Sequence, residues 1–215
     1  MAGLSDAQLF DWLRLIRSEN VGPATFRQLI NTYGSAARAL EALPHLSRRS
    51  GKPIRVHSSE ATEREMDEAA RRGLRLVVTT DPDYPYALRA FDPPPPILTL
   101  AGGSPALSQR PAVAMVGSRN ASAAGMRLCA DMSEVCGRAG LVVVSGLARG
   151  IDAASHRASL ASGTIAVLAG GHANIYPPEH ESLAAEIVER GGAVVTEMPL
   201  GWQARAQDFL RRNRI

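Results

Sequence analysis

The chain has 215 residues and a formal net charge of +3 at neutral pH, and 45% of its residues are hydrophobic against 21% charged. This composition is typical of a globular protein and excludes a disordered or fibrous one. No apolar run reaches the roughly 18 residues of a membrane helix, and the N-terminus lacks the pattern of a signal peptide. We therefore expect no membrane association and a cytoplasmic location. The positive charge suits a polyanionic partner without identifying one.

The first third of the chain is predicted to be helical. Apolar residues recur every three or four positions from Leu4 to about Leu43, the pattern of amphipathic helices. The segment Asn20–Pro23 interrupts the pattern, with Pro23 suited to the first turn of a second helix, and Tyr33–Ser35 supplies a stop and a cap. Residues 44–59 are rich in Pro, Ser, Arg and His and predict a loop, whereas residues 60–73 predict a charged helix.

A passage rich in proline follows. Residues 75–80 predict a strand, the turns at 81–85 and 93–96 cannot lie inside regular elements, and residues 97–100 predict an edge strand. We therefore divide the chain into a helical domain (1–80), a linker with an edge strand (81–110) and a further domain (111–215).

The last domain alternates short apolar runs with helical stretches. The runs lie at 112–116, 141–144, 164–168 and 193–195, and each gap is long enough for a helix. This alternation predicts an α/β fold: a Rossmann-like, mostly parallel sheet with helices on both faces and ligands at the carboxyl ends of the strands. Cys129 and Cys136 lie seven residues apart in one predicted helix, too far apart for a disulfide.

Glycine-bearing loops follow the first three of these strands. They contain Gly117, then Gly146 and Gly150, then Gly170 and Gly171, and two of them also contain arginine. Uncapped amides at the start of a helix bind anions, and glycine allows close approach, so we expect a phosphate-bearing ligand. Each glycine taken alone is explained equally well by a tight turn.

The sequence argues against cofactors. The dinucleotide fingerprint GxGxxG is absent after the first of these strands, no acidic residue ends the second, and no Walker pattern occurs. No His/Cys cluster has metal-ligand spacing. We expect neither a nucleotide cofactor nor a metal ion.

Three acidic or imidazole side chains are candidates for catalysis. Asp152 and His156 are four residues apart and share a helix face, so they could act as an acid/base pair. Because no nucleophile lies beside them, we favour a capping role for Asp152 with His156 bonded to it. Glu197 follows the fourth strand, and we favour a role in ordering a loop or in bonding to a neighbouring arginine over a catalytic role.

The segment from Arg205 to Ile215 is rich in arginine and contains a single acid, Asp208. It is either a solvated helix face or, if it folds back to the strand ends, an extension of the positive surface along a phosphate backbone.

Several of these segments together resemble the DNA processing protein A (DprA/Smf) family. The matching segments occur in the family's order at 83–88, 115–122, 143–156, 163–168, 175–178, 197–201 and 212–215. The resemblance implies a small sterile-alpha-motif-like helical domain before the Rossmann-like domain. It also implies that the chain binds and protects single-stranded DNA and loads RecA onto it in natural transformation, without catalysis. Relatives continue past the position of Ile215 with strands that carry much of their self-association. The α/β domain here is therefore expected to be truncated, and formation of a homodimer stays open.

The resemblance also implies a set of DNA-binding residues. Carried over onto this sequence they are Gly117, Ser118, Arg119, Asn120, Ser145, Gly146, Arg149, Gly150, Gly170, Gly171, Arg212 and Asn213. The alternative is an enzyme resembling nucleotide phosphoribohydrolases and using the same pocket, but the PGGxGTxxE signature of those enzymes is missing here.

Overall fold

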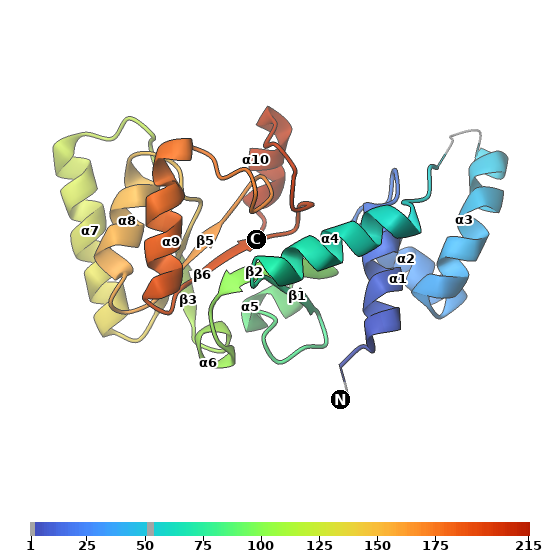
Figure 1. Cartoon of the computed structure of the whole chain (residues 1–215). Helices are drawn as coiled ribbons and strands as arrows, with labels where there is room; N and C mark the ends of the chain where they lie inside the picture. The colour runs from blue at the N-terminus through green and yellow to red at the C-terminus, as the bar shows by residue number, and fades with distance from the viewer. Residues whose placement is uncertain (1–2, 51–53) are drawn as a thin grey trace.

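The computed structural model describes residues 3–50 and 54–215 and shows a helical part beside an α/β part (Figure 1). The helical part contains α1 (Asp6–Arg17), α2 (Pro23–Tyr33), α3 (Ala36–Ser50) and α4 (Ser59–Arg71). As predicted, Pro23 lies in the first turn of α2, and Gly34 ends that helix with a φ of 78°. The core of the helical part consists of apolar side chains from these helices, among them Phe26, Leu29, Leu40 and Leu43.

The loop predicted from residue 44 is wrong over residues 44–50, because α3 continues through Pro44 to Ser50. Leu40 and Leu43 are buried in the helical core and Leu46 packs against it, so the apolar stripe runs on past the proline. Packing of this stripe stabilises the helix enough to accommodate the ring and the missing N–H of Pro44.

A six-stranded sheet, in the order β1-β2-β6-β5-β4-β3, organises the α/β part. Its strands are β1 (Arg75–Val78), β2 (Ile97–Gly102), β3 (Ala112–Ala114), β4 (Val142–Ser145), β5 (Thr164–Val167) and β6 (Ala193–Thr196). The four strands from β3 to β6 are parallel, whereas β1 and β2 are antiparallel to their neighbours. The edge position expected for β2 is wrong, because β1 pairs with its outer side.

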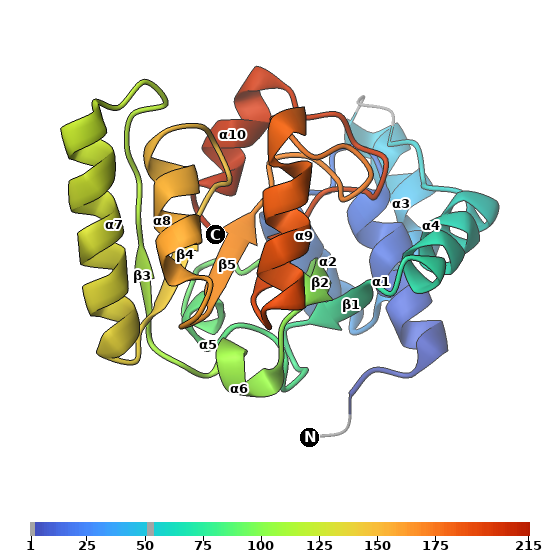
Figure 2. The same cartoon turned by 60° about the vertical axis from the view of Figure 1, so that its left-hand side comes forward.

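Both faces of the sheet are covered. The helices α7 (Ala123–Arg138), α8 (Ile151–Ser159) and α9 (Glu181–Glu189) lie on one face (Figure 2). Ala166 and Val194 face that layer, whereas the next residues, Val167 and Val195, pack on the other face with Tyr84. The second face is covered by the segment of α5 (Tyr86–Arg89) and by the C-terminal residue. This alternation follows the two-residue period of a strand.

The remaining short helices are α6 (Pro105–Ser108), the 3-10 turn η1 (Pro178–His180) and α10 (Ala206–Arg212). Cys129 and Cys136 both lie on α7 and are free thiols. Within the described residues, no helix has the length and apolar character needed to cross a membrane.

The two parts share a core at the β1 edge of the sheet. Leu13 of α1 packs with Val78 and Ile97, which belong to the first two strands. Arg17 at the end of α1 forms a buried ion pair with Glu65 of α4, at 2.8 Å. This joint places the turn between α1 and α2 beside the carboxyl end of β6. The division into domains at residues 80 and 110 stays a prediction.

Candidate functional site

The loops after β3 and β4 lie against each other at the carboxyl edge of the sheet. The amide of Ile151 donates to the Ser118 carbonyl oxygen at 3.2 Å, and the Ser145 hydroxyl donates to the Met115 carbonyl oxygen at 2.6 Å. A Cβ on Gly117 would lie 2.5 Å from the Ile151 side chain. Neither loop can therefore move without the other.

Asp152 holds the loop after β4 in shape. Its Oδ2 accepts from the amides of Gly146 and Ala148, at 3.1 and 3.2 Å. The proposed helix cap is therefore wrong for this residue, because Asp152 lies inside α8 and turns back to the loop amides. The N-cap of α8 is Gly150, which offers no side-chain bond, and the first-turn amides of Ile151 and Ala153 donate instead to the carbonyl oxygens of Ser118 and Ala148.

Three exposed side chains, Arg119, Arg149 and Tyr176, surround the half-buried ring of Phe209 over these loops, and we call these four residues the arginine–aromatic surface. The Arg119 guanidinium lies over the Phe209 ring, 5.0 Å from its centroid, and Tyr176 meets the same ring edge-on at 5.6 Å. Tyr176 is 51% exposed, and Arg149 forms a surface ion pair with Glu179. Phe209 was not among the site residues predicted from the sequence, although a lone phenylalanine in an arginine-rich helix is a signal for a ring that contacts arginine.

The predicted site residues fall into different environments. Residues 117–120 are all exposed, as are Arg149 and Asn213, whereas Gly146 and Gly150 are half-buried. Ser145 is buried, with its hydroxyl bonded to the neighbouring loop.

Three other predicted residues turn inward. The Arg212 Nη1 donates to the carbonyl oxygens of Gly146 and Val167, both at 2.6 Å, and its Nε donates to Asn213. Burial lowers the pKa of Arg212 below its usual value. Gly170 and Gly171 are buried against the loop at 199–202, and the Gly171 amide donates to the Trp202 carbonyl oxygen. These three residues fix the shape of the strand ends, and Arg212 also lines a cavity of about 210 Å³.

The candidate catalytic side chains have structural partners. His156 is fully buried and its Nδ1 lies 2.8 Å from the Thr164 hydroxyl, so the expected bond to Asp152 is wrong. Burial lowers the pKa of His156 to about 3, which keeps the ring neutral. Glu197 pairs with Arg214, which is one of the two roles favoured from the sequence. In the described parts of the chain, no three His, Cys, Asp or Glu side chains form a group that could hold a metal ion.

Comparison with known proteins identifies the family. A family model described as DNA recombination-mediator protein A matches residues 75–215, and a model of the DprA-like N-terminal HHH domain matches residues 6–68. The chain belongs to the DNA processing protein A (DprA/Smf) family. The resemblance found in the sequence is thereby confirmed.

Individual DprA relatives show the same relationship. The chain is 30% identical to Protein Smf of Synechocystis over 95% of its own length and 54% of the relative's. It is 42% identical to Protein Smf of Escherichia coli over 61% of its own length and 36% of the relative's. The chain thus spans about half or less of these curated DprA relatives.

Solved DprA structures share the fold. DprA of Streptococcus pneumoniae matches with a TM-score of 0.69 at 25% identity, over 99% of this chain and 74% of that one. A Helicobacter pylori DprA structure, described for its single-stranded DNA binding mode, matches with a TM-score of 0.58 at 24% identity over 65% of this chain and 62% of that one. The match to two solved members confirms the Rossmann-like α/β fold with an N-terminal helical domain.

Proposed function

We propose that this chain binds single-stranded DNA, without catalysis, on the arginine–aromatic surface at the carboxyl edge of the sheet. The observation that carries the proposal is the stack of Arg119 on Phe209 with Tyr176 beside it. Guanidinium groups bind phosphates, and an exposed aromatic ring stacks on any base, so this combination suits a strand of any sequence. Membership of the DprA family supports the same substrate.

The loops of the site suit a binding role better than a catalytic one. The Asp152 carboxylate is bonded to two loop amides, and Glu197 is paired with Arg214, so neither faces a bound ligand as a free base. This supports binding over the phosphoribohydrolase-like alternative. Incubation with nucleoside monophosphates tests the alternative, and release of free base would contradict our proposal.

We extend the proposal, on the family resemblance alone, to loading of RecA onto the bound strand in natural transformation. Co-purification with RecA, in the presence and absence of an oligonucleotide, tests this step. Self-association and the cytoplasmic location stay predictions.

Titration of labelled oligothymidylate at several salt concentrations tests the DNA-binding proposal. Removing the exposed Tyr176 ring should weaken binding by about 1–3 kcal/mol, the usual contribution of one stacked base. Arg119→Ala should make the salt dependence weaker. The slope of log K, the association constant, against log salt concentration should become less negative by about 0.7, as for one lost phosphate contact on a single strand. The matched control is Arg138→Ala, because Arg138 is an exposed arginine in the last turn of α7. Equal affinity of Tyr176→Ala, Arg119→Ala and the control would refute the site.

A further inference from the structure

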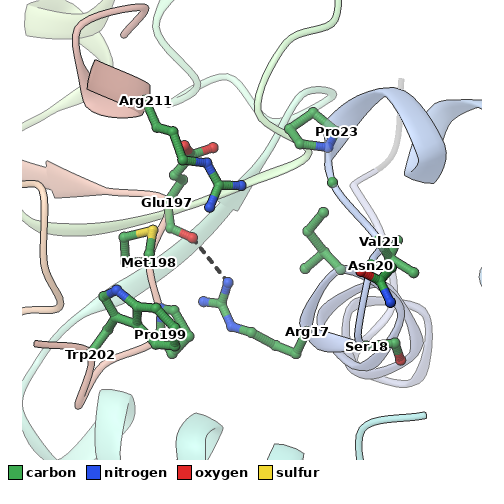
Figure 3. A pocket seen from close by; sticks show the side chains of 12 residues that line it. Arg17, Ser18, Asn20, Val21, Pro23, Glu197, Met198, Pro199, Trp202 and Arg211 are labelled. Atoms are coloured by element: carbon green, nitrogen blue, oxygen red, sulfur yellow. Dashed lines mark hydrogen bonds between the residues drawn. The ribbon is translucent and has the colours of Figure 1, made fainter. Parts of the chain in front are cut away.

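A second cavity lies at the joint between the two parts of the molecule (Figure 3). It measures about 440 Å³, which is within the range of roughly 300–1,000 Å³ for pockets that hold small molecules. One wall comes from the turn between α1 and α2, and the other from the segment after β6 and from α10. We call this cavity the interdomain cleft.

The wall formed by the segment after β6 and by α10 combines apolar side chains with a cation. Met198, Pro199 and Trp202 are its apolar part, and Arg211 extends from α10 toward Arg17 on the opposite wall (Figure 3). The Trp202 indole is held in place, because its Nε1 donates to Asp208 at 2.8 Å. A flat apolar surface beside a cation suits a base with its phosphate.

Among the described residues that line this cleft, Arg211 is the cation that is available to a ligand. Arg17 is only 7% exposed and is already bonded to Glu65 and to the Glu197 carbonyl oxygen. Glu197 is paired in turn with Arg214. The Arg211 side chain is 52% exposed, and its nearest carboxylate oxygen, on Asp208, lies 4.0 Å away. In the part of the chain that the structure describes, this long ion pair and the charge of Glu197 are the interactions of the Arg211 guanidinium, so its donors can still bind a phosphate.

α10 connects the interdomain cleft to the arginine–aromatic surface. Phe209 and Arg211 are two residues apart on this helix, and a helical turn of about 100° per residue directs them to nearly opposite sides. Phe209 contacts Arg119, whereas Arg211 lines the cleft. A strand that leaves the first surface needs to cross only the width of α10, roughly 10 Å, to reach the second.

We propose that the interdomain cleft is a second binding site for the same strand and takes one nucleotide, with its phosphate beside Arg211 and its base on the Trp202 wall. This inference rests on the proposed function, because it requires a strand bound at the arginine–aromatic surface. In this proposal, the contact between the helical part and the α/β part helps to hold a longer strand.

The test compares the shortest oligothymidylate that binds with a longer one. In the wild-type protein the longer strand should bind roughly five- to a hundredfold more tightly, as for one additional stacked base. Arg211→Ala should abolish this gain and leave the affinity for the short strand unchanged. Arg138→Ala, which removes an exposed arginine outside the cleft, should keep the gain.

A second variant tests the opposite wall without disturbing the fold. Asn20 lines the cleft with a φ of 60°, a conformation that aspartate also tolerates. Asn20→Asp should therefore fold normally and weaken binding of the longer strand through charge repulsion. The same change at the exposed Asn31 of α2, which is outside the cleft lining, is the matched control.

Tryptophan fluorescence supplies a readout independent of affinity. The chain contains two tryptophans, and Trp12 is packed on Phe26 in the helical part. The longer strand should quench emission, the short strand should not, and Trp202→Phe should remove the quenching. Unchanged emission on binding of the longer strand would overturn the cleft as a site. An equal loss of affinity for the short and the longer strand in Arg211→Ala would do the same. If the wild-type protein binds neither strand, the proposed function itself is wrong.

Discussion

Gly150 is the position where a single methyl group would separate the two loops of the site. Its φ of 71° and ψ of −120° lie far from any conformation that residues with a side chain adopt readily, which costs about 1–3 kcal/mol. A Cβ there would also lie 2.3 Å from the Ser118 carbonyl oxygen and 2.8 Å from that of Arg119. Displacing this backbone adds about 1–3 kcal/mol. Gly150→Ala should therefore lower the free energy of unfolding by about 2–6 kcal/mol.

Thermal unfolding and oligonucleotide titration check this expectation. For a chain of this size the loss corresponds to a fall in Tm of roughly 5–20 °C, and the displaced Arg119 should weaken DNA binding as well. Gly191→Ala is the control, because Gly191 has a φ of 82° but no atom within 4 Å of the added Cβ. The Gly191→Ala variant should lose about 1–2 kcal/mol of unfolding free energy, from backbone strain alone, and should keep its affinity for DNA. Equal losses in the two variants, with DNA binding retained in Gly150→Ala, would refute the argument that the loops are locked together.

Three further predictions concern buried charges. Arg17→Ala leaves Glu65 buried without its partner and should cost about 3–5 kcal/mol in urea unfolding, whereas replacing both residues by Met and Leu should cost much less. The pKa of His156 falls from 6.5 to about 3 on folding, so below pH 6.5 the unfolded chain binds a proton that the folded one excludes. Stability should thus decrease as pH falls from 6.5, by at most about 1.4 kcal/mol per pH unit from this group, and His156→Gln should show a shallower dependence; an identical slope would contradict the assignment. Arg212→Ala should lower both the Tm and the DNA affinity, whereas Arg119→Ala should lower only the affinity, and a stable Arg212→Ala protein would contradict the structural role of that guanidinium.

Local patterns predicted most of the secondary structure. The three-to-four spacing of apolar residues placed α1 and α2, and the apolar runs placed the four parallel strands, because each pattern reflects one buried face. The pattern failed at Pro44, where packing of Leu43 in the helical core outweighs the local preference of proline. It also failed to place β2 inside the sheet, because the partner of a strand depends on residues distant in the sequence.

The site was predictable in its position but not in its side-chain directions. Parallel strands present their following loops at one edge, so the approach of Gly117 to the loop of Gly150 follows from topology. Arg119 and Arg212 are both arginines beside glycine-bearing loops, yet one is exposed and the other is bonded to two strand-end carbonyls. The sequence could not distinguish these two arginines. The packing of α10 decides which of them reaches buried carbonyl oxygens, and that packing depends on residues distant in the sequence.

The inward position of Arg212 strengthens the case for phosphate binding at this edge. The carboxyl ends of parallel strands present carbonyl oxygens, whose partial negative charge repels a phosphate. Arg212 binds the carbonyl oxygens of Gly146 and Val167 directly, so its charge offsets this repulsion from beneath the surface. Arg119 and Arg149, which are not bonded to strand ends, then remain at the surface above it. One half-buried arginine and two exposed ones thus contribute differently to the same positive edge, and a count of arginines alone would treat them as equal.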